Sequence, residues 1–239
     1  MDISIEQLTL RINDNHILNN VNMEIASGEL VGYLGPNGAG KSSTIKAITG
    51  LLNNYSGKVI IGSELQGSSN ELLKSKMGYV PEDPVLYTHL TMYEHAKMIA
   101  CLYDVPKPKA EEILGYYFSY FNIEAYRNHK IHTVSKGVKQ MLLIITALLH
   151  DPDVIIFDEP LSGLDIENKK KFRELISSLK ENHKTILYSS HNPDFLGVLA
   201  DRIVVIANGE IVSDVPKNEI NATSIEEHYF NIVSNIGRE

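Results

Sequence analysis

The sequence has little cysteine: its 239 residues include a single one, Cys101. One thiol excludes an internal disulfide, so the fold must depend on a hydrophobic core, which 43% hydrophobic residues can supply. Cys101 lies in the apolar stretch 98–102, whose pattern predicts one face of a helix. We therefore expect a buried and unreactive thiol.

Long hydrophobic runs are also absent. The most apolar stretch, residues 141–149, is less than half of the roughly 20 residues that a helix needs to cross a bilayer. Residues 1–6 lack the cationic segment, followed by an apolar one, that marks a secretory signal. We therefore expect a cytosolic chain whose contact with a membrane is indirect, through another polypeptide.

Positive charge is scarce too. Lys and Arg total 22 against 30 Asp and Glu, which gives a net charge of -8 at pH 7. A surface that grips nucleic acid backbones nonspecifically carries the opposite balance. The composition therefore disfavours nucleic acid as a partner and leaves room only for a local basic patch.

Apolar runs predict strands of two kinds. Residues 3–10, 21–25 and 59–61 are short runs near the N-terminus, and we expect them to form a small antiparallel sheet. Four other runs are mostly apolar, as in parallel strands that are covered on both faces. These runs are residues 30–34, 154–157, 185–189 and 203–206. The pattern predicts an α/β fold with an N-terminal antiparallel β part.

Helical signals lie between these runs. The spacing of Thr91 and Glu94 predicts a capping box at the start of an apolar helix. Pro106 and Pro108 break the chain before a helix that we expect over 109–121. Two more helices are expected over 138–149 and 225–236.

We expect one domain made of three parts. Residues 1–85 and 141–220 form the α/β core with its antiparallel strands, and residues 86–140 form an inserted helical subdomain. Residues 221–239 form a C-terminal helical segment, which Ser224 caps at its N-terminus.

A glycine-rich segment after the run 30–34 has the Walker A pattern of phosphate-binding loops. Its members are Gly35, Pro36, Asn37, Gly38, Ala39, Gly40, Lys41 and Ser42, with Ser43 next in the chain. The glycines let several N–H groups face one anion, and the N-terminus of the following helix adds positive potential. Lys41 can reach the β- and γ-phosphates, and the Ser42 hydroxyl can bind magnesium. The segment predicts nucleotide binding, but kinases, GTPases and motor ATPases share it.

Two acidic residues follow the buried run 154–157, at the edge where ligands of open α/β sheets gather. Asp158 can hold magnesium through water, and Glu159 can orient or deprotonate the attacking water. An exposed turn would also explain two adjacent carboxylates. The buried strand before them favours the catalytic interpretation.

With these motifs in this order, nearly the whole chain resembles the ATP-binding cassette (ABC) family of transport ATPases. Residues 134–140, Val-Ser-Lys-Gly-Val-Lys-Gln, resemble the family's signature loop, conventionally Leu-Ser-Gly-Gly-Gln, in the Ser-x-Gly form of drug and peptide exporters. The resemblance implies that Ser135 and Gly137 contact the γ-phosphate of an ATP held by a partner subunit. A plain helix N-cap explains Ser135 equally well.

The resemblance implies further contacts. Residues 162–165 resemble the D-loop, whose Asp165 is implied at the dimer interface. His191, after the run 185–189, resembles the switch histidine that contacts the γ-phosphate near Glu159, although a lone histidine at a strand end is usually structural. The family implies a P-loop NTPase fold with a RecA-like core, the ligands ATP and Mg²⁺, a homodimer or heterodimer of cassettes, and a separate transmembrane permease. Such a subunit would lie at the cytoplasmic face of the membrane.

Two positions depart from the family pattern. Glu82 stands where a glutamine usually senses magnesium, and it would place another negative charge near Glu159. Ile12 stands where an aromatic residue usually stacks on adenine, so we expect looser base discrimination unless His16 substitutes. Met141 follows the signature where arginine is common.

Three other functions compete with the transport ATPase. A P-loop kinase needs no signature loop, no D-loop and no histidine at the position of His191. A non-transport cassette acting in DNA repair or on the ribosome usually carries long coiled coils or two cassettes per chain. A catalytically silent ATP sensor would not need Lys41, Asp158 and Glu159 intact. Export is the expected direction, because residues 79–82 and 135–137 resemble exporter cassettes.

Overall fold

The computed structural model describes residues 1–67, 70–193, 195–220 and 224–236. The chain folds into two compact units, each described by itself. Unit 1 comprises Met1–Lys74 and Leu179–Glu239, and unit 2 comprises Ser75–Ser178.

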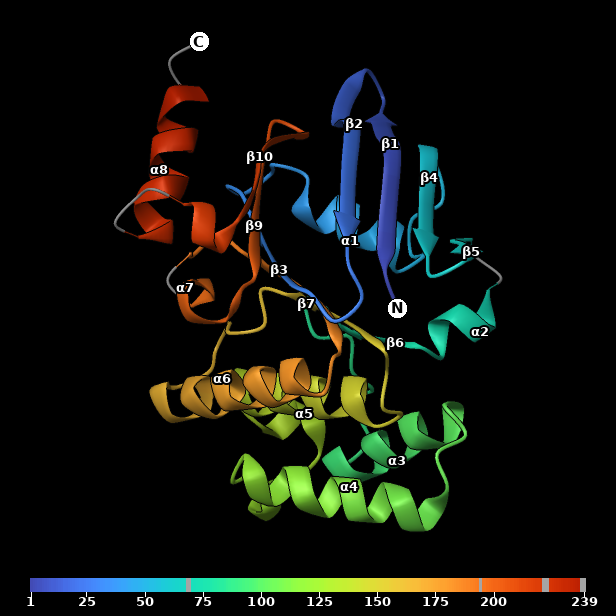
Figure 1. Cartoon of the computed structure of the whole chain (residues 1–239). Coiled ribbons are helices and arrows are strands. Elements are labelled where there is room, and N and C mark those ends of the chain that lie inside the picture. Colours follow the sequence, from blue (N-terminus) through green and yellow to red (C-terminus); the bar gives the residue numbers. More distant parts are fainter. Residues whose placement is uncertain (68–69, 194, 221–223, 237–239) are drawn as a thin grey trace. The chain divides into compact units, whose positions relative to one another are not determined.

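Unit 1 contains the predicted antiparallel sheet, with the strand order β2-β1-β4-β5. Figure 1 shows β2, β1 and β4 side by side. The strands are β1 (Ile3–Ile12), β2 (Asn15–Ile25), β4 (Ser56–Ile61) and β5 (Glu64–Leu65). Strand β2 begins well before the predicted Val21, because it pairs with β1 as far as the tight turn that follows Ile12.

Unit 1 also contains four strands in the order β10-β9-β3-β8. They are β3 (Leu30–Leu34), β8 (Thr185–Ser190), β9 (Arg202–Ala207) and β10 (Glu210–Pro216). Strand β3 pairs in parallel with β8 and β9, which confirms the predicted parallel core strands in this unit. Strand β10 pairs antiparallel with β9 and was not predicted.

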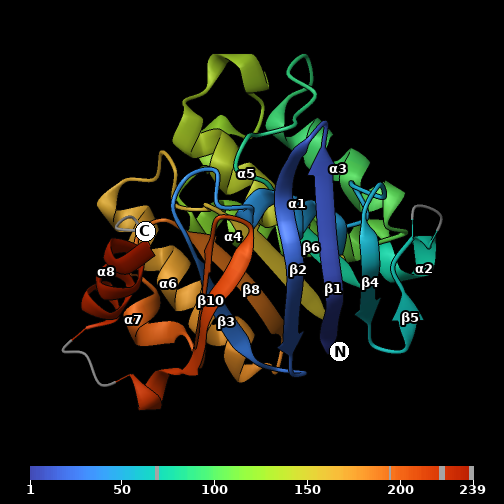
Figure 2. The same cartoon turned by 90° about the horizontal axis from the view of Figure 1, so that it is seen from above.

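The α-helices that lie wholly in the described part of unit 1 are α1 (Lys41–Ile48), α2 (Glu71–Lys74), α7 (Leu196–Leu199) and α8 (Ile225–Ile236), with a short 3₁₀ turn η3 (Lys217–Glu219). Figure 2 shows α7 and α8 beside the β9–β10 hairpin. The Ser224 hydroxyl accepts a bond of 3.0 Å from the Glu227 N–H, as the predicted cap requires. Residues 221–223 and 237–239 of the predicted C-terminal segment lie outside the described residues.

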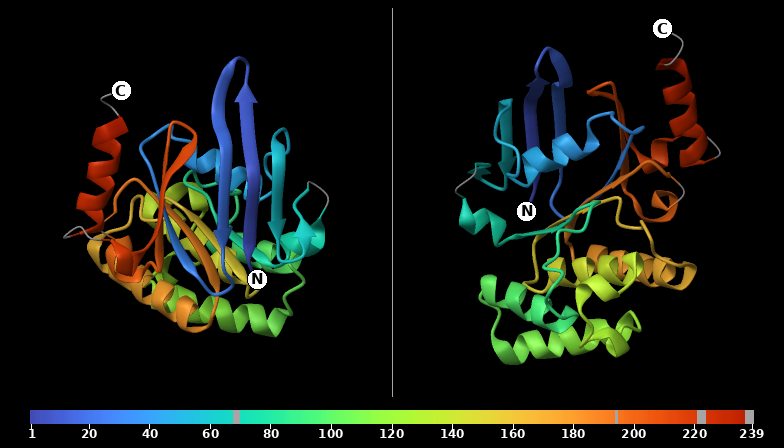
Figure 3. Two further views of the ribbon diagram at one scale, coloured as in Figure 1. Left: turned by 45° about the horizontal axis from the view of Figure 1, so that its top comes forward. Right: turned by 180° about the vertical axis from the view of Figure 1, so that it is seen from behind.

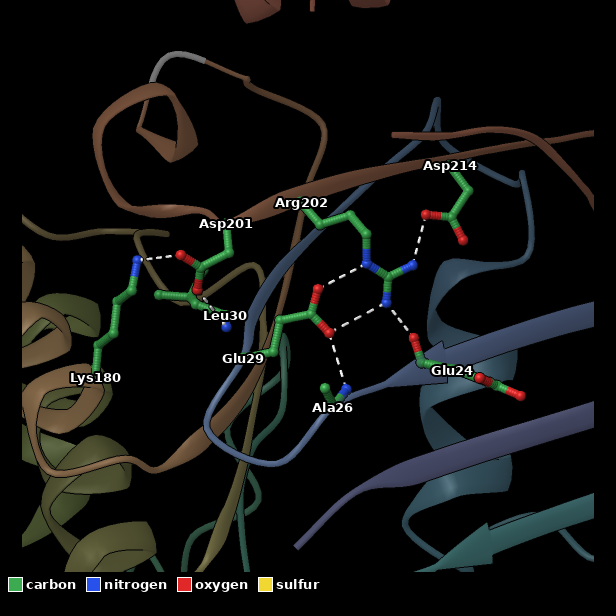
Figure 4. A network of polar contacts seen from close by, with 8 residues as sticks. All are labelled: Glu24, Ala26, Glu29, Leu30, Lys180, Asp201, Arg202 and Asp214. Carbon is green, nitrogen blue, oxygen red and sulfur yellow. Dashed lines mark hydrogen bonds and ion pairs between the residues drawn. The ribbon is translucent and has the colours of Figure 1, made fainter. Parts of the chain in front are cut away.

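A network of charged groups joins the strands of unit 1 (Figure 4). The Arg202 guanidinium donates to both carboxylate oxygens of Glu29, at 2.7 and 3.3 Å, and to Asp214 at 2.5 Å. Burial opposes the charge, but the bonds to the two carboxylates outweigh it and raise the pKa of Arg202. Lys180 donates to Asp201 at 2.6 Å, and the other oxygen of Asp201 accepts from the Leu30 N–H. The network therefore fixes the start of β3.

Unit 2 pairs strands β6 (Met77–Val80) and β7 (Val154–Asp158) in parallel and carries most of the helices. Its helices are α3 (Met92–Leu102), α4 (Lys107–Tyr120), α5 (Lys136–Leu148) and most of α6 (Ile166–Glu181), with short 3₁₀ turns η1 (Glu124–Tyr126) and η2 (Ile131–Thr133). Both views of Figure 3 show α3 against α4. The predicted capping box of Thr91 and Glu94 is present.

Three expectations for unit 2 were wrong. Helix α4 begins at Lys107, because Pro106 occupies its N-cap and Pro108 fits the first turn, where no N–H is needed. Helix α5 begins at Lys136, so Gly137 lies inside its first turn instead of before it. Cys101 is exposed, because α3 turns this side chain away from its packed face.

No helix in the described part of the chain is long and apolar enough to cross a membrane.

Candidate functional site

The glycine-rich loop 35–40 of unit 1 connects the fully buried strand β3 to helix α1. Gly40 caps α1 with φ of 110°, a backbone conformation that side chains rarely allow. A Cβ at Gly35 would lie 2.4 Å from the carbonyl oxygen of Ile206. The path of this loop is therefore open only to glycine at these two positions, and it brings the first N–H groups of α1 to the end of β3.

Lys41 folds back over this loop from the first turn of α1. Its Nζ donates to the carbonyl oxygens of Gly35, at 2.6 Å, and Pro36, at 3.2 Å. The residue is only 7% exposed, so its ammonium group is held where the loop and the helix N-terminus meet. Ser42 and Ser43 follow in the same turn and are half-buried. These groups together suit an oxyanion.

A tight turn between β9 and β10 supports the glycine-rich loop through backbone hydrogen bonds. Asn208 and Gly209 have φ of 51° and 80° and join β9 to β10 as the two-residue turn of a hairpin. The Gly209 N–H donates to the Ala39 carbonyl at 3.0 Å, and the Gly209 carbonyl accepts from the Asn19 N–H at 2.8 Å. Sequence reasoning missed this support, although the Asn-Gly pair between apolar runs is a known hairpin signal.

His191 leaves the sheet beside the loop. Strands β3 and β8 are parallel and pair Leu34 with Ser190, so the next residue of each strand, Gly35 and His191, leaves at the same edge. The exposed His191 side chain is therefore close in register to the start of the phosphate-binding loop.

Ile12 lies at the end of β1 and is 53% exposed, paired in register with Asn15. His16 is also exposed and pairs with Arg11 on the neighbouring strand. Both predicted base contacts are thus accessible surface groups of unit 1.

Unit 2 holds the acidic residues. Strand β7 is buried throughout and delivers Asp158, which is 2% exposed. Glu159 follows in the left-handed region with φ of 47°. Strand β6 pairs Val80 with Phe157, so Glu82 leaves this strand pair at the same edge as the two acids.

Tyr79 is a neighbour that sequence reasoning missed. Burial and, to a lesser degree, the negative charges of Asp158 and Glu82 raise the pKa of its hydroxyl. The direction of this shift reports that the phenol is buried near the two carboxylates. The exporter-like run 79–82 includes Tyr79 but does not predict this environment, because the effect depends on which face of β6 the side chain occupies.

The signature loop and the D-loop lie against each other in unit 2. The Ser135 hydroxyl caps α5 by accepting from the Val138 N–H at 3.3 Å, and Asp165 caps α6 by accepting from the Asn168 N–H at 2.8 Å. A cavity of about 310 Å³ is lined by residues of both loops, including Ser135, Gly137 and Asp165. The predicted interface residues thus form one surface feature.

The structure therefore gathers the predicted residues into two sets. Unit 1 carries the phosphate-binding loop with Lys41, Ser42 and His191, and unit 2 carries the acids and the signature residues. The hydroxyl of Ser42 and the carboxylates of Asp158 and Glu82 are hard oxygen donors, which fit Mg²⁺.

Known proteins match this chain closely. The family model described as ABC transporter matches residues 18–162. The linearmycin resistance ATP-binding protein LnrL of Bacillus subtilis (strain 168) is 34% identical over 208 residues, which are 85% of this chain and 66% of LnrL.

Solved structures agree with the sequence matches. An ATP-binding subunit of an ABC transporter has a TM-score of 0.90 at 28% identity and covers 98% of this chain and 100% of that chain. A dimeric bacterial ABC transporter cassette, MJ0796, has a TM-score of 0.82 at 24% identity, over 90% of this chain and 98% of that chain. These likenesses confirm the predicted P-loop NTPase fold with an antiparallel β part.

Proposed function

The chain belongs to the ABC transporter family as an ATP-binding subunit, and from this premise we propose that it hydrolyses ATP as a dimer to drive a separate transmembrane permease. The observation that carries the proposal is the loop 35–40, where a backbone path that requires glycine at positions 35 and 40 and the overlying Lys41 together suit a phosphate group. The subunit would sit at the cytoplasmic face of the membrane and touch the bilayer only through the permease.

Binding of ATP would replace the carbonyl partners of Lys41 with phosphate oxygens. The ammonium group that now donates to Gly35 and Pro36 would donate to the β- and γ-phosphates, while N–H groups of residues 37–43 hold the phosphate oxygens. Ser42, Asp158 and Glu82 would hold magnesium, directly or through water. Magnesium, when bound, neutralises charge on the phosphates.

Hydrolysis needs a base and a group that steadies the water. Glu159 would accept the proton of the attacking water, and His191 would donate to the γ-phosphate. The left-handed backbone of Glu159 supports this role, since strained conformations are kept where function needs a fixed side chain.

The dimer would place each ATP between two copies. Ser135, Gly137 and Asp165 would face the nucleotide that the other copy holds, with the N-terminus of α5 directed at its γ-phosphate. The two cassettes could be identical chains or a pair of different ones. Exposure of Ser135 and Asp165 in the single chain supports this arrangement.

Export is the proposed direction of transport. It rests on the likeness to LnrL, whose name assigns it to linearmycin resistance, and on the exporter-like residues 79–82 and 135–137.

Phosphate release by the purified chain tests the proposal. Lys41→Met and Glu159→Gln should each lower the rate by at least about 100-fold, because each removes charge or proton transfer from the transition state. Lys46→Met is the matched control: Lys46 is an exposed lysine of the same helix, and its loss should leave the rate within twofold. A wild-type rate in Lys41→Met would refute the assigned site.

A further inference from the structure

We propose that Lys136 is a positioning residue that ties the signature helix to Glu159 of the same chain and so couples the two ATP sites of a dimer. The inference rests on the proposed function. It starts from a departure in the sequence, because Lys136 stands where the signature Leu-Ser-Gly-Gly-Gln has its first glycine.

The first link joins the signature loop to the D-loop. Lys136 Nζ donates to the Ser162 hydroxyl at 2.7 Å. The backbones are packed closely at the next residues, since a Cβ at Gly137 would lie 2.5 Å from the Gly163 carbonyl oxygen. A Cβ at Gly163 would in turn lie 3.1 Å from Cγ of Lys136. The first turn of α5 is therefore in direct contact with residues 162–163 through both a side-chain bond and closely packed backbone.

The second link joins the D-loop to the catalytic glutamate. The Ser162 N–H donates to the Glu159 carbonyl at 3.3 Å, which closes a turn that starts at Glu159. Glu159 has φ of 47°, a conformation that persists only where the surrounding structure holds it. A shift of Ser162 would therefore act on the turn that begins at Glu159.

The two ends of this series of contacts, the signature loop and Glu159, would face different ATP molecules of the dimer. Ser135 and Gly137 would contact the γ-phosphate held by the second copy, whereas Glu159 would act on the nucleotide of its own copy. A phosphate that settles on the signature helix of one chain would thus set the water-activating group of the same chain, through Lys136 and Ser162. A glycine at position 136 could not make the side-chain link.

Thermal stability should not depend on this bond. Lys136 and Ser162 are joined at the surface, and exposed pairs of this kind contribute little to folding. The readout must therefore be kinetic.

The experiment compares ATP hydrolysis by full-length Lys136→Met, Lys136→Arg, Ser162→Ala and the double variant Lys136→Met/Ser162→Ala. Lys136→Met and Ser162→Ala should each lower kcat about threefold to tenfold, with KM for ATP within twofold of wild type. Their Hill coefficients should fall toward that of independent sites. The double variant should lose no more than either single one, because both remove one bond, and Lys136→Arg should recover most of the rate.

Lys170→Met is the matched control, because it removes an exposed positive charge from α6 of the same unit and leaves the bond from Lys136 to Ser162 intact. Its kcat and Hill coefficient should equal those of wild type. A similar loss in Lys170→Met would mean that the charge of unit 2, and not the bond from Lys136 to Ser162, determines the rate.

Other outcomes separate this inference from the proposed function. Suppose that wild type hydrolyses ATP, that Glu159→Gln does not, and that Lys136→Met keeps the wild-type kcat and Hill coefficient. The proposed function then stands, while the coupling role of Lys136 is refuted. A Lys136→Met variant with raised KM and unchanged kcat would also refute it, since Lys136 would then act in binding. If Lys136→Met does not fold, Ser162→Ala carries the same test.

Discussion

Glu159 is the acidic residue to which we assign the proton transfer, and Glu82 is the departure from the family pattern at the proposed magnesium site. Glu159 directly follows a strand that is buried throughout, so its backbone is anchored on one side by the core and on the other by the turn to Ser162. Glu82 leaves the neighbouring strand at the same edge and is exposed. Two carboxylates near one metal repel each other unless the cation is bound, so we expect unusual dependence on magnesium.

Glu82→Gln tests this expectation. The substitution removes one negative charge from the proposed magnesium site, so the magnesium concentration for half-maximal hydrolysis should rise at least about threefold. The measurement is a magnesium titration at saturating ATP. Asp83→Asn, which removes the adjacent exposed carboxylate, is the control and should keep the wild-type titration. Superimposable curves for Glu82→Gln and wild type would remove Glu82 from the site.

At the scale of the elements, helix α5 is buried along most of its length, from Gln140 to Leu148. It carries the signature serine at one end and approaches β6 at the other, where a Cβ at Gly78 would lie 2.4 Å from the Ala147 carbonyl oxygen. An added methyl group at Gly78 would therefore clash with a backbone atom, which cannot move aside as the end of a side chain can. The position of Glu82, four residues further along, therefore depends on a glycine at position 78.

Gly78→Ala should lower the free energy of unfolding by about 1–3 kcal/mol, because the extra methyl overpacks the contact between β6 and α5. Gly115→Ala is the control: Gly115 lies in α4 with no atom within 4 Å of a Cβ, and alanine there should stabilise the helix by about 0.5–1 kcal/mol. Urea denaturation of the three proteins measures both changes. Equal midpoints for Gly78→Ala and wild type would contradict the close contact.

The elements differ in how far the sequence predicted them. Strands β3 and β7 were predicted almost to the residue, because continuous apolar runs are buried on both faces. The cap at Thr91 was also predicted, since it depends on neighbours in the chain. Strand β10 was missed because its exposed and half-buried residues alternate without a strongly apolar face.

Of the candidate site, the sequence predicted the residues with a motif and missed those that act through distant contacts. Residues 35–42 form a local structure in which the glycines are required by the backbone conformation, so the motif was enough to predict the loop. The surroundings of Tyr79 and the bond from Lys136 to Ser162 depend on tertiary packing, which no local pattern reports. The turn at Gly209 does have a local signal, its Asn-Gly pair, but its contact with the phosphate-binding loop depends on tertiary packing as well. The assigned roles of the motif residues, and of Ile12, stay predictions.

At the scale of the whole molecule, the chain divides its proposed chemistry between two compact units. Unit 1 supplies the phosphate-binding loop and His191, and unit 2 supplies the acids, the signature helix and the D-loop. The proposed function needs groups of both sets to act on ATP, with a second copy of the chain supplying the signature contact.

The most direct test of this account is the oligomeric state of Glu159→Gln by sedimentation velocity, with ATP and magnesium or with ADP and magnesium. The variant should be a dimer with ATP, because it binds the nucleotide without cleaving it, and a monomer with ADP. Adding Ser135→Arg should abolish the ATP-dependent dimer, since a bulky side chain would occupy the place of the partner's phosphate. A Glu159→Gln variant that stays monomeric with saturating ATP, or dimerises equally well with Ser135→Arg, would contradict the account.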